Sequence, residues 1–191
     1  NNDIVYVGGG FTTIGSQTRN RLAAIEVGGS LTSWNPNVGG NFVLTLTINN
    51  NIVYAGGSFT SVSSQTRNNL AAIDMNGLVT GWSPVVGGYV NTLAVKGNNV
   101  YVGGSFTSVG GMTRNRLAAI DINGSLTSWN PDANWEVNTL AINNNTVYVG
   151  GLFTIVGGQT RNYLAAIDIG GSVIDWNPNV GGNYVYVLSV D

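Results

Sequence analysis

Val-Tyr-Val-Gly-Gly-Ser-Phe, at residues 100–106, is the stretch that decides the fold, because close copies of it begin at residues 5, 53 and 147. The phenylalanines that end the four copies are 48, 47 and 47 residues apart. A fixed period of this length indicates one supersecondary unit used several times. We therefore divide the chain into repeat units 1–48, 49–96, 97–142 and 143–191, which leave no linker and predict a single domain, 1–191.

Residues further from the motif keep the same spacing and complete the pattern of each unit. They are the tryptophans Trp34, Trp82, Trp129 and Trp176, and the prolines Pro36, Pro84, Pro131 and Pro178. Around the third copy, period-two and all-apolar stretches predict four strands. Their ranges are Val90–Val95, Val100–Gly104, Leu117–Asp121 and Leu126–Trp129. Asn-Gly and Gly-Gly pairs between them, such as Asn123-Gly124, are typical of tight hairpins.

Repeated four-stranded antiparallel sheets of about 47 residues predict an all-β fold, specifically a β-propeller of four blades. The chain begins in a second strand and ends just after a first strand, Tyr184–Val190. The last strand could therefore complete the first blade and hide two exposed sheet edges. Two alternatives remain open: two chains forming an eight-bladed ring, and a segment of a longer protein. The absence of an initiator Met favours a processed or excised segment.

Residues 100–121 together with 124–131 resemble the delta-sixty repeat class of bacterial β-propellers. The resemblance extends over all four copies. It implies a secreted or cell-surface protein, and it transfers no catalytic residue. The number of copies is small for that class, so the resemblance leaves open how the blades close.

Composition excludes several classes of function. Only 8% of the residues are charged, the net charge is −2, and there is no His and no Cys. Without them there is no disulfide, no thiol nucleophile and no imidazole base or ligand. Seven basic residues are too few for a nucleic-acid partner, and no apolar run is long enough for a membrane span. The Gly-Gly pairs lack the Gly-Lys-Ser/Thr ending of a phosphate loop, so we expect no cofactor and no metal.

Each unit also carries an arginine and, seven residues later, an acid. The pairs are Arg19 and Glu26, Arg67 and Asp74, Arg114 and Asp121, Arg161 and Asp168. This constant offset predicts a structural clamp, as an ion pair or as hydrogen bonds from the guanidinium to loop carbonyls. Binding of an anionic ligand by the four arginines is the alternative. Arg21 and Arg116, present in two copies only, are expected on the solvated surface.

The loops before the first strands vary in sequence but each retains an aromatic residue. These are Phe42, Tyr89, Trp135 and Tyr184, with the acids Asp132 and Glu136 beside Trp135. In a closed propeller they would surround the mouth of the channel on the face that carries the long loops. They are our candidate ligand-binding residues, because aromatic faces stack on sugars and form protein hot spots. The alternative is that they plug the channel or pack on neighbouring blades.

The sequence therefore predicts a non-enzymatic extracellular binding or scaffold module that recognises a glycan or a protein. The first alternative is a purely structural module of a surface adhesin or extracellular fibre, in which self-association or further blades provide the contacts. A glycoside hydrolase using Asp132 and Glu136 is a second alternative, and the chain's few acids do not favour it. Asp132 and Glu136 are the only acids near each other outside the clamp positions.

Overall fold

The computed structural model describes residues 4–191, and in this range the chain forms antiparallel strands and no helix. The predicted all-β class is therefore confirmed. The range also contains no helix of the length and hydropathy needed to cross a membrane.

Four main sheets follow one another along the chain. We call them sheets 1 to 4. Sheet 1 consists of β1 (Ile4–Gly8) and β4 (Leu22–Glu26). The other three have an inner, a middle and an outer strand. Sheet 2 has β5 (Val38–Asn49), β6 (Ile52–Val62) and β8 (Leu70–Asp74); sheet 3 has β9 (Val90–Lys96), β10 (Asn99–Gly104) and β13 (Leu117–Asp121); sheet 4 has β14 (Val137–Asn143), β15 (Thr146–Gly151) and β18 (Leu164–Asp168).

Short hairpins occupy the long loops between the middle and outer strands, a feature that the sequence analysis did not anticipate. They are β2 (Thr13–Ile14) with β3 (Gln17–Thr18), the end of β6 with β7 (Gln65–Thr66), β11 (Ser108–Val109) with β12 (Met112–Thr113), and β16 (Ile155–Val156) with β17 (Gln159–Thr160). Their turns contain positive-φ residues, as at Gly110 and Gly111. In two of the four turns, at residues 110–111 and 157–158, a Gly-Gly pair is the sequence signal for the hairpin.

The predicted fourth strand of each unit is reduced to one bridge on the outer strand. In sheet 3 the bridge joins Leu126 to Ile120, and Leu31, Val79 and Val173 make the equivalent bridges. Just after it, both the amide and the hydroxyl of Thr127 donate to the carbonyl of Ala119, at 2.9 Å each. The amide of Ile174 donates to the carbonyl of Ala166 in the same way in sheet 4, at 3.0 Å, and beyond this bond the chain leaves the sheet.

The sheets do not coincide with the sequence repeats. Inner strand β9 belongs to unit 49–96 but pairs with β10 of unit 97–142, in the register Val100↔Val95 and Val102↔Leu93. Each of sheets 2 to 4 therefore takes its inner strand from the preceding repeat unit. This exchange links consecutive units through main-chain hydrogen bonds.

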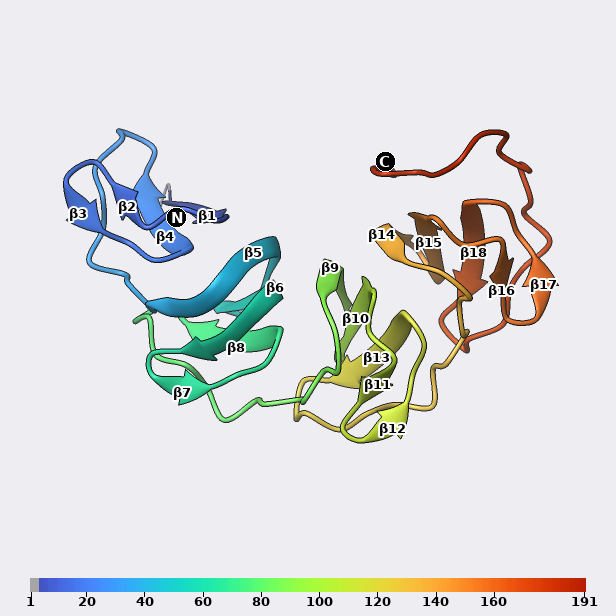
Figure 1. The fold of residues 1–191 in the computed structure, drawn as a ribbon, viewed down its shortest axis with the longest axis horizontal. Coiled ribbons are helices and arrows are strands. Elements are labelled where there is room, and N and C mark those ends of the chain that lie inside the picture. The colour runs from blue at the N-terminus through green and yellow to red at the C-terminus, as the bar shows by residue number, and fades with distance from the viewer. Residues whose placement is uncertain (1–3) are drawn as a thin grey trace.

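The four sheets stand side by side in an open arc, with the inner strands β5, β9 and β14 turned towards the centre (Figure 1). The first sheet and the C-terminal segment lie on opposite arms of this arc. The expected pairing of Tyr184–Val190 with the first sheet is not formed: within residues 4–191, β1 pairs with β4 alone. The segment instead lies beside β14, where Asn138 Nδ2 donates to the carbonyl of Val185 at 3.2 Å.

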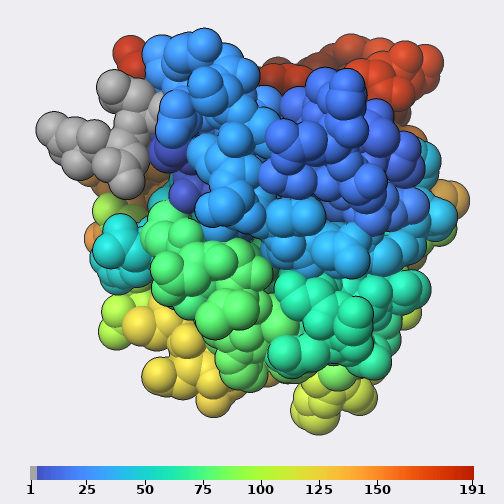
Figure 2. Space-filling model, turned by 90° about the vertical axis from the view of Figure 1, so that its left-hand side faces the viewer, coloured from blue at the N-terminus to red at the C-terminus, as the bar shows by residue number. Residues whose placement is uncertain are grey.

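Three hydrophobic cores hold the arc together, and each lies between two consecutive sheets rather than within one. In the core between sheets 2 and 3, Trp82 packs edge-to-face on Tyr54, with ring centroids 5.1 Å apart. Its indole N–H donates to the carbonyl of Asp121 in the next unit at 2.8 Å. Trp34 and Trp129 make the same bond to Asp74 and Asp168, at 2.9 and 3.0 Å. Figure 2 shows the first unit (blue) resting directly on the second (teal to green).

Glycine in the middle strand allows this close approach of the sheets. A Cβ added to Gly103 would lie 2.7 Å from Cγ1 of Val137 in the next sheet and 2.7 Å from Cγ2 of Thr92. Gly8, Gly56 and Gly150 stand in the same relation to Val43, Val90 and Val185. The first glycine of each Gly-Gly pair is therefore required for close packing of one sheet on the next.

We predict that Gly103→Ala destabilises the protein by about 1–3 kcal/mol, because the new methyl group overpacks the core between sheets 3 and 4. This corresponds to a loss of about 3–10 °C in Tm, measured by thermal unfolding followed by circular dichroism. The control is Gly81→Ala, where an added Cβ meets nothing within 4 Å. Equal Tm values for the two variants would contradict the assigned role of Gly103.

Candidate binding surface

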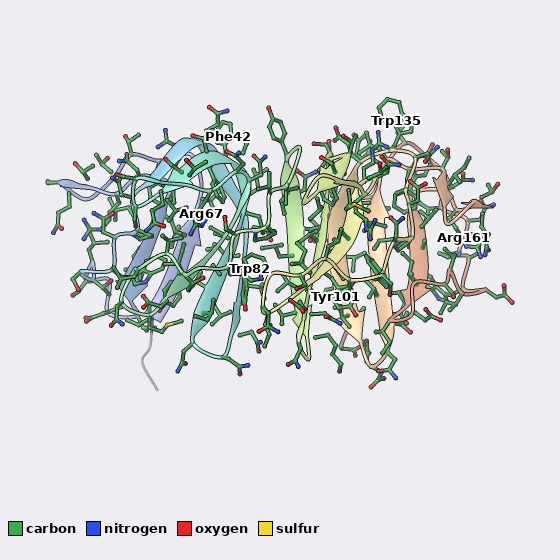
Figure 3. The ribbon with its side chains drawn as sticks, turned by 90° about the horizontal axis from the view of Figure 1, so that it is seen from below. Phe42, Arg67, Trp82, Tyr101, Trp135 and Arg161 are labelled. Atoms are coloured by element: carbon green, nitrogen blue, oxygen red, sulfur yellow. The ribbon has the colours of Figure 1, made fainter. Side chains whose placement is uncertain are left out.

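Four exposed aromatic side chains stand just before or at the start of the inner strands and of the C-terminal segment. Phe42, Tyr89, Trp135 and Tyr184 are 51%, 53%, 58% and 51% exposed. Figure 3 shows Phe42 and Trp135 projecting from the same end of the sheets. We call these four residues the aromatic row. Because about half of each side chain faces solvent, they are not packed as a plug in this open arc.

The sheet register shows how the row is built. A Cβ added to Gly57, Gly104 or Gly151 would overlap the main-chain carbonyl of Phe42, Tyr89 or Glu136, respectively. These glycines are thus needed where the inner and middle strands cross closely at the bulge. Trp135 stands one residue before the position of Phe42 and Tyr89, and Glu136 takes that position in sheet 4. The aromatic side chain is therefore displaced towards the loop in one unit.

The loop that carries Trp135 is fixed to the next long loop. Asn134 Oδ1 accepts hydrogen bonds from the amides of Thr154 and Ile155 at 2.9 and 3.0 Å. Its Nδ2 donates to Thr154 Oγ1 at 3.0 Å, and Ala133 forms a bridge with Val156. Trp135 is thus an exposed side chain on a loop that several hydrogen bonds hold in place. Binding residues are commonly presented on loops by a rigid scaffold in this way.

The two acids of this loop differ in environment. Asp132 is exposed and has a φ of 56°, and the carbonyl of Asp132 accepts from the amide of Gly157 at 3.1 Å. Glu136 is half-buried, and its carbonyl accepts from Leu152 at 2.9 Å. Within residues 4–191 no group of three or more acidic side chains is placed to hold a metal ion. Both carboxylates are available as hydrogen-bond acceptors beside Trp135.

The four repeated arginines bind main-chain carbonyls. Arg67 Nη2 donates to the carbonyl of Thr80 at 2.8 Å, and Nη1 donates to that of Thr66 at 2.8 Å. The other three make the equivalent bonds: Arg19 to Thr32 and Thr18, Arg114 to Thr127 and Thr113, Arg161 to Ile174 and Thr160. Each guanidinium therefore ties the long loop to the segment that precedes the tryptophan.

The repeated acids do not bind these arginines; among residues 4–191 the hydrogen bonds of Asp74, Asp121 and Asp168 go to the next turn. Asp121 Oδ1 accepts from the amides of Asn123 and Ser125 at 2.9 and 2.8 Å. The ion-pair form of the clamp is thus wrong for these three units. The acid ends the outer strand, beyond the reach of a guanidinium committed to carbonyls at the other end of the unit. The seven-residue offset reflects two separate local structures.

Arg21 and Arg116 are not solvated surface residues as expected. Arg21 donates to the carbonyls of Asn41 and Val38 at 3.0 and 2.9 Å, and Arg116 donates to that of Ala133 at 3.4 Å. In unit 49–96 Asn69 takes the place, with Nδ2 bonded to the carbonyl of Val86 at 3.0 Å. All three have positive φ, between 63° and 66°. These three residues have left-handed backbone geometry, and their side chains hold the loops before the inner strands in place.

A hollow of about 580 Å³ lies between the first two sheets, away from the aromatic row. Tyr6, Thr32 and Trp34 line its wall, and Asn51 and Met75 come from two hairpin turns. Trp34 is buried, so its ring is occupied in the core. Burial raises the pKa of the Tyr6 phenol above its ordinary value. No motif in the sequence indicates this hollow.

Comparisons with known proteins support the fold alone. No family model matches the sequence, and no curated protein shows significant similarity. Among solved structures, the chain is similar to the crystal structure of the computationally designed Ika4 protein, with 16% identity and a TM-score of 0.55 over 88% of this chain and 86% of that one. The computationally designed Ika8 protein has 15% identity and a TM-score of 0.42 over 91% of this chain and 71% of that one.

We predict that the turn after β8 makes stability depend on pH through Asp74. Hydrogen bonds from the amides of Leu78 and Asn76 hold the pKa of this carboxyl below its ordinary value of 3.8. A lowered pKa contributes stability above the unfolded-state pKa, and this contribution is lost as the pH falls through the folded-state value. Asp74→Asn should therefore lose less Tm than the unmodified chain between pH 6 and pH 3.

The comparison is made by thermal unfolding at several pH values in that range. Ser33→Ala, a change of an exposed side chain, is the control and should follow the unmodified chain. A parallel fall of Tm in Asp74→Asn and in the unmodified chain would contradict the prediction.

Proposed function

We propose that this chain is a non-enzymatic extracellular binding module of the β-propeller type, built from delta-sixty-like blades, and that it recognises a glycan. The aromatic row with Asp132 and Glu136 forms the binding surface. The observation that carries the proposal is the exposure of four large aromatic side chains in corresponding loops. Burying apolar area is favourable, so exposed aromatic groups gathered in one region are typical of binding sites.

The exposure of the row contrasts with the structural aromatic residues of the same chain. Tyr101 and Trp129 form an edge-to-face pair with centroids 5.0 Å apart, and both rings are buried. The repeated fold therefore has its own aromatic packing and does not use the row for it. The side chains of Phe42 and Tyr89 are consequently available at the surface, and Tyr184 presents its ring together with that of Tyr186, whose centroid lies 4.5 Å away.

A carbohydrate fits the chemistry of this surface. Aromatic faces stack on the apolar faces of sugar rings, and rigid aromatic side chains lose little entropy on binding. Asp132 and Glu136, beside Trp135, supply acceptors for sugar hydroxyl groups. The net charge of −2 provides no strong field for a polyanionic ligand. A surface protein that docks on the same aromatic residues is the outcome to be tested if glycans do not bind.

We predict a saturable change of tryptophan fluorescence when the chain is titrated with members of a glycan panel. Trp135 is exposed on the row, so the change should disappear in Trp135→Phe and decrease in Tyr184→Ala. Trp176→Phe is the matched control, because Trp176 is the other exposed tryptophan and lies outside the row. Its titration should be unchanged.

Loss of the signal in Trp176→Phe with retention in Trp135→Phe would place the site elsewhere. Absence of any signal across the panel would remove the glycan proposal, and protein docking would then be measured with the same variants. Turnover of a glycan that persists in Trp135→Phe and is abolished in Glu136→Gln would contradict the non-enzymatic proposal.

A further inference from the structure

The two end sheets of the arc carry the two halves of the interface that the chain forms three times internally. The face of sheet 1 that points away from sheet 2 is not covered by any part of residues 4–191. Val5 is 49% exposed, whereas Val53, Val100 and Val147, its equivalents in the other units, are 0% exposed. In sheets 2, 3 and 4 the equivalent face packs against the preceding sheet and forms one of the three cores.

The fourth unit presents the opposite half. Trp176 keeps its edge-to-face contact with Tyr148, at 5.2 Å between centroids, but is 42% exposed. Trp34, Trp82 and Trp129 are 5%, 6% and 3% exposed. Each of those three donates its indole N–H to a carbonyl of the next unit, and the Trp176 indole forms no hydrogen bond within residues 4–191.

The matching acceptor site stands open on sheet 1. The carbonyl that corresponds to those of Asp74, Asp121 and Asp168 is that of Glu26. Gly77, Gly124 and Gly171 in the adjoining turns lie 3.4–3.6 Å from the preceding tryptophan, measured from an added Cβ. An added Cβ on Gly29, their equivalent, meets nothing within 4 Å. The site for a tryptophan beside Glu26 is therefore present, and no side chain of residues 4–191 fills it.

The strand edges are complementary in the same way. The middle strands β6, β10 and β15 each pair with an inner strand on one edge and an outer strand on the other. Within residues 4–191, β1 pairs only with the outer strand β4, so its inner edge is free. Residues 185–190 correspond to an inner strand, and Val187 is 82% exposed. The register of β9 with β10 places Val100 opposite Val95. Transferred to the ends of the chain, it places Val5 opposite Val190 and Val7 opposite Leu188.

The arc cannot bring these ends together by itself without changing its cores. The three tryptophan bonds and the four glycine–valine approaches are alike, so each sheet is set against the next by the same close packing. Packed interiors resist such deformation. With this packing, the first sheet and the C-terminal segment remain on separate arms (Figure 1). A second copy satisfies both ends with every internal contact unchanged.

We propose that two copies of the chain join head to tail through these end faces. The C-terminal segment of each copy pairs with β1 of the other, and Trp176 of each donates to the Glu26 carbonyl of the other. The interface is heterologous and is used twice, so it closes the assembly as a ring of eight sheets and leaves no free edge. The proposal does not depend on glycan binding.

The first test measures mass in solution. At micromolar concentration, light scattering coupled to size exclusion should give twice the 19.9 kDa of the chain. Trp176→Ser and Val5→Lys should each shift the mass to that of one chain. Circular dichroism should remain unchanged, because both residues lie outside the three internal cores. Trp135→Ser, an exposed tryptophan away from the end faces, is the matched control and should retain the doubled mass.

The second test identifies the contact. The chain has no cysteine, so Val5→Cys and Val190→Cys provide single thiols in separate chains. After mixing, dissociation and reassociation under mild oxidation, a disulfide-linked pair should form from the two variants together. Neither variant alone should give it, because Val5 meets Val190 and not itself. The doubly substituted chain should give a species of two chains joined by two disulfides.

Several results would overturn the proposal. One is the mass of a single chain for the unmodified protein. Another is an internal disulfide in a single chain of the doubly substituted protein, which would show closure onto itself. A third is a series of growing polymers, which would show that the rotation between copies does not close. A doubled mass that survives both Trp176→Ser and Val5→Lys would place the interface elsewhere.

Discussion

The close approach of each middle strand to the inner strand of the next sheet is the constraint on which the rest of the structure depends. Gly56 and Gly103 leave room for Val90 and Val137, and this contact brings each tryptophan within reach of a carbonyl in the following unit. The hydrophobic cores then form between sheets rather than inside them. The open arc, the uncovered end faces and the aligned loops that carry the aromatic row all follow from this repeated step.

Much of the fold could be predicted because the repeat presents each strand four times. Val100–Gly104 and Leu117–Asp121 were placed within one residue of β10 and β13, since alternation and hairpin residues bracket them. The strand predicted at Leu126–Trp129 is reduced to a bridge at Leu126 and one further main-chain hydrogen bond from Thr127. The short hairpins were missed because two-residue strands have no periodicity to detect. Whether the sheets close into a ring depends on the angle between consecutive sheets. Many packing contacts set this angle together, so no single residue or motif in the sequence indicates it.

The candidate site was predictable in part. The four aromatic residues could be selected because their loops change sequence while retaining a ring, but only the structure showed that these rings are exposed. The spacing of Arg114 and Asp121 correctly indicated repeated polar contacts and misled on their partners. The arginine donates to loop carbonyls, and the acid accepts from turn amides. Both partners are main-chain groups that residues of every type carry, so the sequence does not identify them. A constant offset between two charged residues thus reports the repeat, and it does not by itself report an ion pair.

The placement of the cores has a consequence for how the chain unfolds. A core that lies between neighbours belongs to two units at once, so a unit removed from the middle of the arc would cost two cores, and one removed from an end would cost one. Stability in such an array is close to a sum over nearest neighbours. In a single chain with its end faces uncovered, melting should therefore start at the termini and proceed inwards, and the amides of sheets 2 and 3 should exchange with deuterium later than those of sheets 1 and 4. In the proposed ring every sheet has two neighbours, so this difference should be lost. Each further sheet adds one core, so a longer array of such sheets is more stable.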